Sequence, residues 1–250
     1  MAEPFRVGFV PGVSPGKWLS RWEERMPDSP LEPRLVEVVE QRELLTAGEL
    51  DVCFVRLPLD REGLHLIPLY TEVPVVVAAK DHPLTAFDEL DVADLAGEHL
   101  LQDPATCPEW AAVADEVRDG TRVETPPMTL EQAVEVAASG AGVVILPMSL
   151  ARLHQRKDVR HRPLTGVAGS GIGIAWLVDN EDPRVETFVG IVRGRTERSS
   201  RQPVDDGARP REEPRPSAAH GGAPQPGRGR GRSGPRRQGP PGRRRGRGGR

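Results

Sequence analysis

The sequence predicts an α/β protein of two lobes, followed by a separate basic tail. Strand-like and helix-like segments alternate through residues 5–55, which is typical of βαβ units and a parallel sheet. A second alternating series runs from residue 73 to residue 195, so we expect a second lobe and a cleft between the two. The periodicity stops near residue 200, where the composition also changes.

The first series begins with residues 5–10, whose alternate apolar side chains predict a buried strand. Ser14 followed by Pro15 predicts a helix N-cap with proline at the first helical position. We expect this helix to end before Pro27, because proline disrupts a helix interior. The next expected elements are a strand over 35–39, a helix over 41–47 and a strand over 52–55.

The second series opens with a run of valines over residues 73–77, which predicts a strand. Thr129 stands where an N-cap would precede a helix over 129–138. The β-branched run 143–146 predicts the strand that follows this helix. The other expected elements are helices over 92–95, 110–117 and 183–195, a short strand over 99–102, an extended segment over 121–125 and a strand over 172–178.

The charge is distributed unevenly along the chain. Residues 1–200 contain 20 Lys and Arg against 33 Asp and Glu, a net charge of −13. Residues 201–250 contain 14 Arg against 4 acids, a net charge of +10, and have no Leu, Ile, Phe, Met, Trp or Tyr. Such a segment buries too little apolar surface to offset its chain entropy, so we predict that it is disordered.

The sequence also bears on the cellular compartment. It has no apolar run as long as the ~18 residues of a membrane span, and its start does not resemble a secretory signal. We therefore expect a cytoplasmic protein. Cys53 and Cys107 are too few for a disulfide scaffold and are expected to be unbridged.

Four stretches in order resemble a known family. They are the opening strand with its Ser/Pro-capped helix, the step Ala47-Gly48-Glu49-Leu50-Asp51-Val52, the stretch from Leu69-Tyr70 to Asp81-His82-Pro83-Leu84, and the helix-to-strand run from Val134 to Pro147. Together they resemble the substrate-binding domain of LysR-type transcription regulators over residues 5–195.

This resemblance implies a type 2 periplasmic-binding-protein fold, with two Rossmann-like lobes joined by two crossover strands. One lobe would take roughly residues 5–73 and 167–195, and the other roughly 75–163. It also implies a small effector, an organic acid or aromatic compound, between the lobes, and a homodimer. A full regulator begins with a helix-turn-helix, and here the first strand starts at residue 5, so we do not expect sequence-specific DNA binding to carry over.

The sharpest ligand candidates are two helix starts, at Ser14, preceded by Val13, and at Thr129. A helix N-terminus offers free N–H groups and a partial positive charge, which favour a carboxylate. The resemblance places both on the walls of the cleft. The alternative is that each hydroxyl only caps its helix.

Further candidates come from strand ends and loops. Arg56 follows a strand and offers a fork of donors to an anionic ligand, or else forms a surface ion pair with Asp51 or Asp60. Gln102, Asp103 and Thr106 lie in a proline-rich loop expected to face the cleft. Trp18 and Trp22, one turn apart on the first helix, either form a dimer contact or line the core.

Neither a catalytic centre nor a metal or cofactor site is predicted. Cys53 reads as a small buried hydrophobe, and Cys107 has no His or Lys beside it in the sequence to activate it. The six histidines lack metal-ligand spacing. Gly171-Ile172-Gly173 follows no strand-to-helix turn, so it is not a dinucleotide fingerprint, and the P-loop motif is absent from the sequence.

Three functions follow as alternatives. The first is a non-enzymatic effector-binding module involved in transcription regulation, and the second is an enzyme on the same two-lobed fold, such as a prephenate dehydratase-like protein. The third is a nucleic-acid-binding protein acting through residues 220–250, which hold ten arginines and no acids. Lacking aromatics, this segment would bind phosphate backbones without sequence preference, or it has no role.

Overall fold

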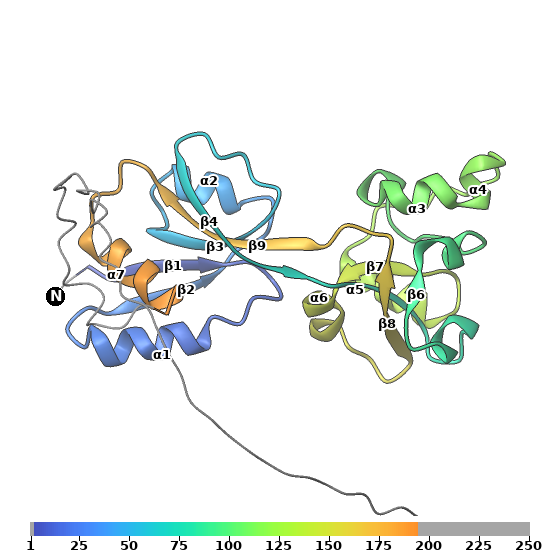
Figure 1. Ribbon diagram of the computed structural model, residues 1–250, viewed down its shortest axis with the longest axis horizontal. Helices are drawn as coiled ribbons and strands as arrows, with labels where there is room; N and C mark the ends of the chain where they lie inside the picture. Colours follow the sequence, from blue (N-terminus) through green and yellow to red (C-terminus); the bar gives the residue numbers. More distant parts are fainter. Residues whose placement is uncertain (1–2, 195–250) are drawn as a thin grey trace, which may run out of the picture. The chain divides into compact units, whose positions relative to one another are not determined.

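The computed structural model describes residues 3–194 (Figure 1). Its strands are β1 (Phe5–Phe9), β2 (Leu31–Leu35), β3 (Val52–Arg56), β4 (Leu64–Glu72), β5 (Pro74–Ala79), β6 (Leu90–Asp91), β7 (Val144–Pro147), β8 (Val159–Thr165) and β9 (Ser170–Leu177). Its α-helices are α1 (Gly16–Arg25), α2 (Gln41–Thr46), α3 (Pro108–Val113), α4 (Asp115–Arg118), α5 (Leu130–Ala138), α6 (Met148–Leu153) and α7 (Pro183–Val192). Its 3-10 helices are η1 (Pro83–Ala86), η2 (Val92–Leu95) and η3 (Pro104–Thr106). The basic tail lies outside the described residues, so its disorder and its nucleic-acid binding stay predictions.

Five strands form the first sheet, in the order β2-β1-β3-β9-β4. β1 pairs in parallel with β2 and with β3, as the βαβ pattern predicts. β9 runs antiparallel to both β3 and β4. The parallel pairing expected from the pattern of residues 5–55 is therefore confirmed for β1, β2 and β3.

The side chains of β3 alternate between two cores on opposite faces of this sheet. Val52 and Phe54 join the core formed with α1 and α7, whereas Cys53 and Val55 join the core formed with α2. Figure 1 shows α1 and α7 on one side of the sheet and α2 on the other. All of β3 is buried, in agreement with the continuous apolar run of its first four residues, Val52 to Val55.

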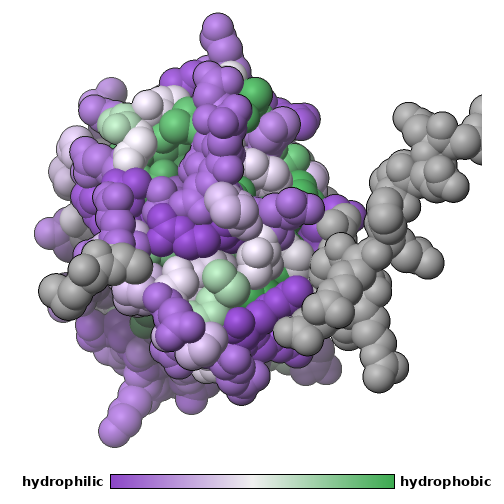
Figure 2. Space-filling view, turned by 90° about the vertical axis from the view of Figure 1, so that its left-hand side faces the viewer, coloured by the Kyte–Doolittle hydropathy of each residue, from purple (hydrophilic) through white to green (hydrophobic). Residues whose placement is uncertain are grey.

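Both tryptophans of α1 belong to the core. Trp22 is fully buried and stacks on Phe5, with the ring centroids 4.8 Å apart. Trp18 stacks on Phe54 at 4.6 Å. Core packing is therefore confirmed, and the alternative of exposed tryptophans at a dimer contact is wrong. The face of the molecule drawn in Figure 2 is mostly hydrophilic, with hydrophobic residues in small separate areas.

Four strands form the second sheet, in the order β6-β8-β5-β7. β5 is antiparallel to β7 and β8, and β6 is parallel to β8. Along β5, Val75 and Val77 pack in the core that contains α5, whereas Val76 and Ala78 pack in the core around Trp110. This sheet is therefore also covered by apolar side chains on both faces.

The chain passes between the two sheets twice. β4 belongs to the first sheet and β5 to the second, and Val73 alone separates them. The return path runs from β8 to β9 through residues 166–169. Two lobes joined by two crossover strands are the arrangement that the resemblance implies.

Some expected elements differ in the structure. The strand expected over 35–39 lies at Leu31–Leu35, where Pro33 is tolerated because β2 is an edge strand. The segment 99–102 forms one bridge, from Leu100 to Val143, and 121–125 forms no strand. β4, β8 and α6 were not predicted from the sequence.

Burial of Cys53 is expected to make the free energy of unfolding depend on pH in the alkaline range. Its side chain is fully buried, as predicted, and this burial raises the pKa of the thiol to about 12. Below its unfolded pKa of ~8.5 the thiol keeps its proton in both states. Above that pH the unfolded chain loses the proton first, so the free energy of unfolding should fall by ~1.4 kcal/mol per pH unit.

Urea unfolding of the wild type and of Cys53→Ala at pH 8 and at pH 10 measures this contribution. The wild type should lose ~2 kcal/mol more than the variant between the two pH values. Cys107 and Tyr70, whose pKa values are also raised by burial, are present in both proteins and cancel in the difference. Equal pH dependence in both proteins would show that solvent reaches Cys53.

Candidate functional site

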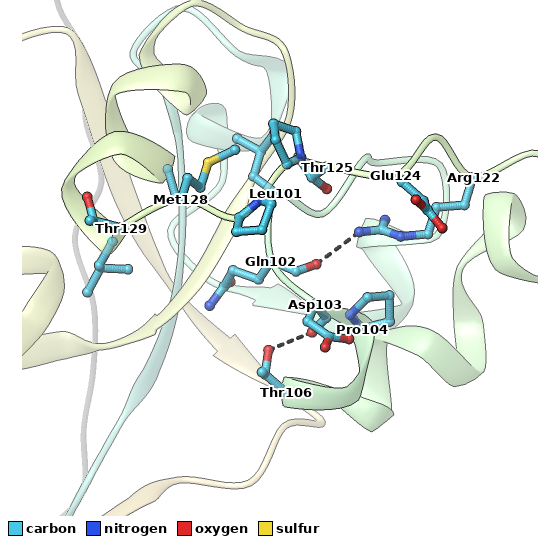
Figure 3. A pocket seen from close by; sticks show the side chains of 14 residues that line it. Leu101, Gln102, Asp103, Pro104, Thr106, Arg122, Glu124, Thr125, Met128 and Thr129 are labelled. Carbon is cyan, nitrogen blue, oxygen red and sulfur yellow. Dashed lines mark hydrogen bonds between the residues drawn. The ribbon is translucent and has the colours of Figure 1, made fainter. Parts of the chain in front are cut away.

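A hollow of about 840 Å³ is built by residues between Leu101 and Ala133 (Figure 3). Its volume is in the range of small-molecule pockets. Three predicted ligand contacts, Gln102, Thr106 and Thr129, line it together. Leu101, Met128 and Leu130 add apolar surface to the same hollow. The hollow therefore combines a few polar groups with an apolar wall.

The side chain of Gln102 is held in one orientation by β7. Its amide oxygen Oε1 accepts a hydrogen bond of 2.7 Å from the backbone N–H of Ile145. Among the described residues, its Nε2 group has no hydrogen-bond partner, and Figure 3 shows it pointing away from Arg122, into the space between Thr106 and Thr129. Two N–H donors are therefore available to a ligand at a fixed position.

Arg122 fixes the backbone on which Gln102 stands. Its Nη2 donates to the carbonyl oxygens of Leu100 and Gln102, at 2.8 and 2.9 Å. Its Nη1 pairs with Glu116, which also contacts His99 Nδ1 at 2.8 Å. The sequence gives no local signal for this role, because Arg122 lies 20 residues from Gln102 along the chain.

A close backbone approach fixes the same segment from the other side. The N–H of Leu101 donates to Val143, and the N–H of Val143 donates to His99. A side chain at Gly142 would place its Cβ 2.5 Å from the carbonyl oxygen of His99. Glycine is therefore required there, which gives a physical reason for this part of the helix-to-strand run.

Thr129 caps α5, as predicted. Its hydroxyl accepts a hydrogen bond from the N–H of Gln132, whose side chain accepts from the N–H of Thr129 in return. This capping box leaves the N–H groups of Leu130 and Glu131 at the first turn for water or a ligand. The positive end of the helix dipole favours an anionic group at this place.

The loop on the opposite side of the hollow is organised by Asp103. Its carboxylate accepts from the N–H of Ala105 at 2.9 Å and caps η3. The Thr106 hydroxyl donates to the backbone oxygen of Asp103 at 2.7 Å (Figure 3). The Thr106 oxygen is therefore left with lone pairs for a ligand and has already used its proton.

The charged residues of the hollow are Asp103, Glu124 and Arg122. Arg122 is already paired with Glu116, so its charge is largely neutralised. The two carboxylates are exposed and make the rim acidic. Such a rim repels anions in proportion to their charge, so it disfavours a dianionic ligand more than a monoanionic one.

Ser14 and Val13 do not line this hollow. The N-cap of α1 is Pro15, which has helical angles of φ −77° and ψ −8°, and no side chain caps the helix. The predicted Ser14 cap is therefore wrong: Pro15 already adopts the helical conformation, and Ser14 stands exposed outside it. Val13 is buried in the core of the first sheet.

Arg56 is buried, and it pairs with neither of the two acids that the sequence suggested. Its Nη1 contacts Glu72 at 2.6 Å, and both side chains are at most 10% exposed. Asp51 pairs with Arg6 and Asp60 with Arg42 instead. The interpretation of Arg56 as a surface ion pair is therefore wrong.

Arg56 also binds the start of β9 and the loop after β1, whereas its buried Nε has no hydrogen-bond partner among the described residues. Its Nη1 also donates to the Ser170 hydroxyl at 2.8 Å, and its Nη2 donates to the carbonyl oxygen of Pro11 at 3.1 Å. Glu72 ends β4 and Ser170 begins β9, and the two residues are paired in the sheet. Both Nη atoms of Arg56 are thus occupied by the protein, and direct contact of this side chain with a ligand stays a prediction.

Thiol and metal chemistry find little support in the described residues. Cys53 and Cys107 are both buried, and burial raises the pKa of each thiol, so the reactive thiolate is scarce at neutral pH. Within residues 3–194 no group of three or more His, Cys, Asp or Glu is arranged to hold a metal ion.

No helix in that range is both long and apolar enough to cross a membrane.

Comparison with known proteins decides the family. The family model described as the LysR substrate binding domain matches residues 2–197. The chain belongs to the LysR substrate-binding domain family. Solved structures of LysR-type regulators agree, so the periplasmic-binding-protein-like fold implied by the resemblance is confirmed.

Two solved structures show the likeness to other LysR domains. The reduced form of the OxyR regulatory domain from Pseudomonas aeruginosa is 27% identical, covers 76% of this chain and 96% of its own, and has a TM-score of 0.54. The BenM effector binding domain with its effector benzoate covers 83% of this chain and 98% of its own, with a TM-score of 0.60. At 19% identity the latter likeness concerns the fold alone.

Curated LysR relatives are longer than the matched region. HcaR, the hca operon transcriptional activator of Escherichia coli, is 28% identical over 76% of this chain and 67% of its own length. CatR, a transcriptional regulator of Pseudomonas putida, is 32% identical over 62% of this chain and 55% of its own length. The matched region thus spans between about half and two thirds of these regulators.

Proposed function

We propose that this chain is the effector-binding module of a LysR-type transcription regulator, and that its effector is a small organic acid with a compact apolar body. The supporting observation is the convergence of the Gln102 amide and the α5 N-terminus on one hollow with an apolar wall. The names of HcaR and CatR support the regulatory part of the proposal. Benzoate, the effector named for BenM, is an acid of the proposed kind.

The chemistry of the hollow suggests how such an acid would bind. A carboxylate accepts hydrogen bonds, and the donors in reach are Gln102 Nε2 and the first N–H groups of α5. An aromatic or aliphatic body would lie against Leu101, Met128 and Leu130. The acidic rim favours one carboxylate over two.

Replacing Gln102 by glutamate tests this arrangement with little change of shape. The glutamate oxygen can still accept from Ile145, whereas the amide donor is exchanged for a negative charge. We expect a carboxylate effector to bind at least about tenfold more weakly, because a hydrogen bond to a charged group contributes ~1.5–3 kcal/mol. A thermal-shift screen of benzoate and other monocarboxylates, followed by titration calorimetry of the hits, measures this change.

Asn180→Asp is the matched control, because it makes the same amide-to-acid exchange in the loop between β9 and α7. It should leave effector affinity unchanged. Thr129→Val removes the α5 cap and should weaken binding as well. If a hit binds Gln102→Glu and Thr129→Val as tightly as the wild type, the effector site is elsewhere.

Localisation, oligomeric state and the lack of catalysis are part of the same proposal. As part of a regulator, the chain would act in the cytoplasm, as a homodimer and without catalysing a reaction. The enzyme alternative finds no support among the relatives, which are named as regulators. Non-specific nucleic-acid binding through residues 220–250 stays a hypothesis about a segment outside the described residues.

A further inference from the structure

Basic residues gather in one short segment of an otherwise acidic protein. Of the 18 Lys and Arg in residues 3–194, five fall between positions 152 and 162, where Asp158 is the single acid. The segment runs from the end of α6 into β8. We call these five residues the basic cluster: Arg152, Arg156, Lys157, Arg160 and Arg162.

The basic cluster surrounds a second hollow of about 580 Å³. Its apolar lining comes from Val77, Ala151 and Val159, which are all buried. Gln155, His161 and every member of the basic cluster except Arg152 complete the lining. Neither Asp nor Glu is among the described residues that line it. It shares no lining residue with the hollow proposed for the effector.

Most of these cations are not neutralised by the protein. Arg156 pairs with Asp158 at 3.0 Å. Among the described residues, no carboxylate lies within ion-pair distance of Arg152, Lys157, Arg160 or Arg162. Like charges this close repel one another, so the unliganded protein bears a cost that a bound anion would remove.

The two strand arginines are held in place by neutral groups. Arg162 donates from Nε and Nη2 to the carbonyl oxygens of Phe87 and Thr85. Arg160 donates to the carbonyl oxygens of Lys157 and Val159. Carbonyl oxygens fix a guanidinium without cancelling its charge, so both arginines are preorganised cations.

The behaviour of His161 agrees with an unbalanced positive field. Its pKa lies below the usual value because of burial and of the nearby Arg152 and Arg162 charges. At neutral pH its ring is therefore largely uncharged. Its position in the lining of the hollow also makes it a natural reporter of an arriving anion.

We infer that the hollow within the basic cluster binds a small polyvalent anion of the phosphate class. Three unneutralised cations in its lining match the charge of a pyrophosphate or phosphomonoester. A concave site of this volume suits a small molecule. The buried apolar residues in its lining offer a contact surface to an organic group attached to the phosphate.

The test follows the ring signal of His161 by proton NMR in the full chain, with His161→Gln identifying the resonance. Pyrophosphate and ribose 5-phosphate are titrated at constant ionic strength, with sodium chloride as the reference. We expect a saturable shift with at least one of the two phosphates and none with chloride. The tighter of the two phosphates indicates whether the natural anion is inorganic or organic.

Lys157→Gln with Arg160→Gln removes two of the exposed cations. The midpoint of the His161 titration should then move to at least about tenfold higher phosphate concentration. Arg61→Gln with Arg193→Gln removes the same charge from exposed positions elsewhere and should leave the midpoint unchanged. Both double variants keep the arginine-rich tail, so phosphate bound by the tail is common to them.

Three results would overturn the inference. The first is a His161 signal that neither phosphate moves. The second is a shift that chloride reproduces. The third is a titration that both double variants follow alike. If the Lys157 and Arg160 variant loses binding to duplex DNA while neither phosphate binds the wild type, the basic cluster serves a nucleic acid instead.

Discussion

Replacing Glu72 by glutamine is expected to lower the free energy of unfolding by about 3–5 kcal/mol. The change leaves the Arg56 guanidinium buried without a carboxylate, since Ser170 and Pro11 supply only neutral acceptors. A buried charge without a counter-charge is far more costly than the pair itself. Urea unfolding followed by tryptophan fluorescence at pH 7 measures the loss.

Glu49→Gln is the matched control for this change. Its partner is Arg34, and both side chains are about half exposed, so the loss should stay within ~1 kcal/mol. Combining Glu72→Leu with Arg56→Met removes both charges and should recover part of the loss. A Glu72→Gln variant as stable as Glu49→Gln would show that water reaches this pair in solution.

Replacing Trp22 by alanine should have an effect of similar size, about 3–5 kcal/mol. The ring is fully buried between Phe5, on which it stacks, and Phe188, which meets it edge-on. Its indole N–H donates to the carbonyl oxygen of Ser29 at 2.9 Å. The substitution leaves a large cavity and an unpaired carbonyl oxygen.

Thermal or urea unfolding of Trp22→Ala, Trp22→Phe and Ser20→Ala checks this prediction. Trp22→Phe keeps an aromatic ring and should fall between the other two. Ser20 is exposed on the same helix, and its replacement should change stability by no more than ~0.5 kcal/mol. Sedimentation of the same variants measures association. If Trp22→Ala lost association without losing stability, the prediction that Trp22 stabilises the core would be contradicted.

The elements that the sequence predicts well are those with local signals. Thr129 and Gln132 form a capping box, which four consecutive residues are enough to reveal. The buried run of β3 is likewise readable from its own composition. Ser14 carried an equally local signal, but the helical angles of Pro15 moved the cap by one residue. The difference lies in a backbone angle that the residue types alone do not determine.

The features that sequence reasoning missed depend on contacts between distant segments. Glu72 meets Arg56 because β9 pairs with both β3 and β4 in the first sheet. In the sequence, Pro68 argues against a strand at β4. The structure tolerates this proline because β4 is an edge strand with a bulge. The role of Arg122 in holding Gln102 also requires the folded second sheet. Each of these contacts follows from the topology, which no local pattern contains.

The two crossovers differ in their conformational freedom. Val73 supplies one pair of backbone torsions between β4 and β5, and its carbonyl oxygen also accepts a hydrogen bond from Met148 at 2.9 Å. The other crossover has four residues, including Gly166 at a φ of 76° and Gly169. A rotation of one sheet against the other would therefore change the backbone torsions of Val73 in one crossover. In the other crossover the change could be shared among residues 166–169. An effector that changes the angle between the sheets would therefore act through very few backbone torsions at the Val73 crossover.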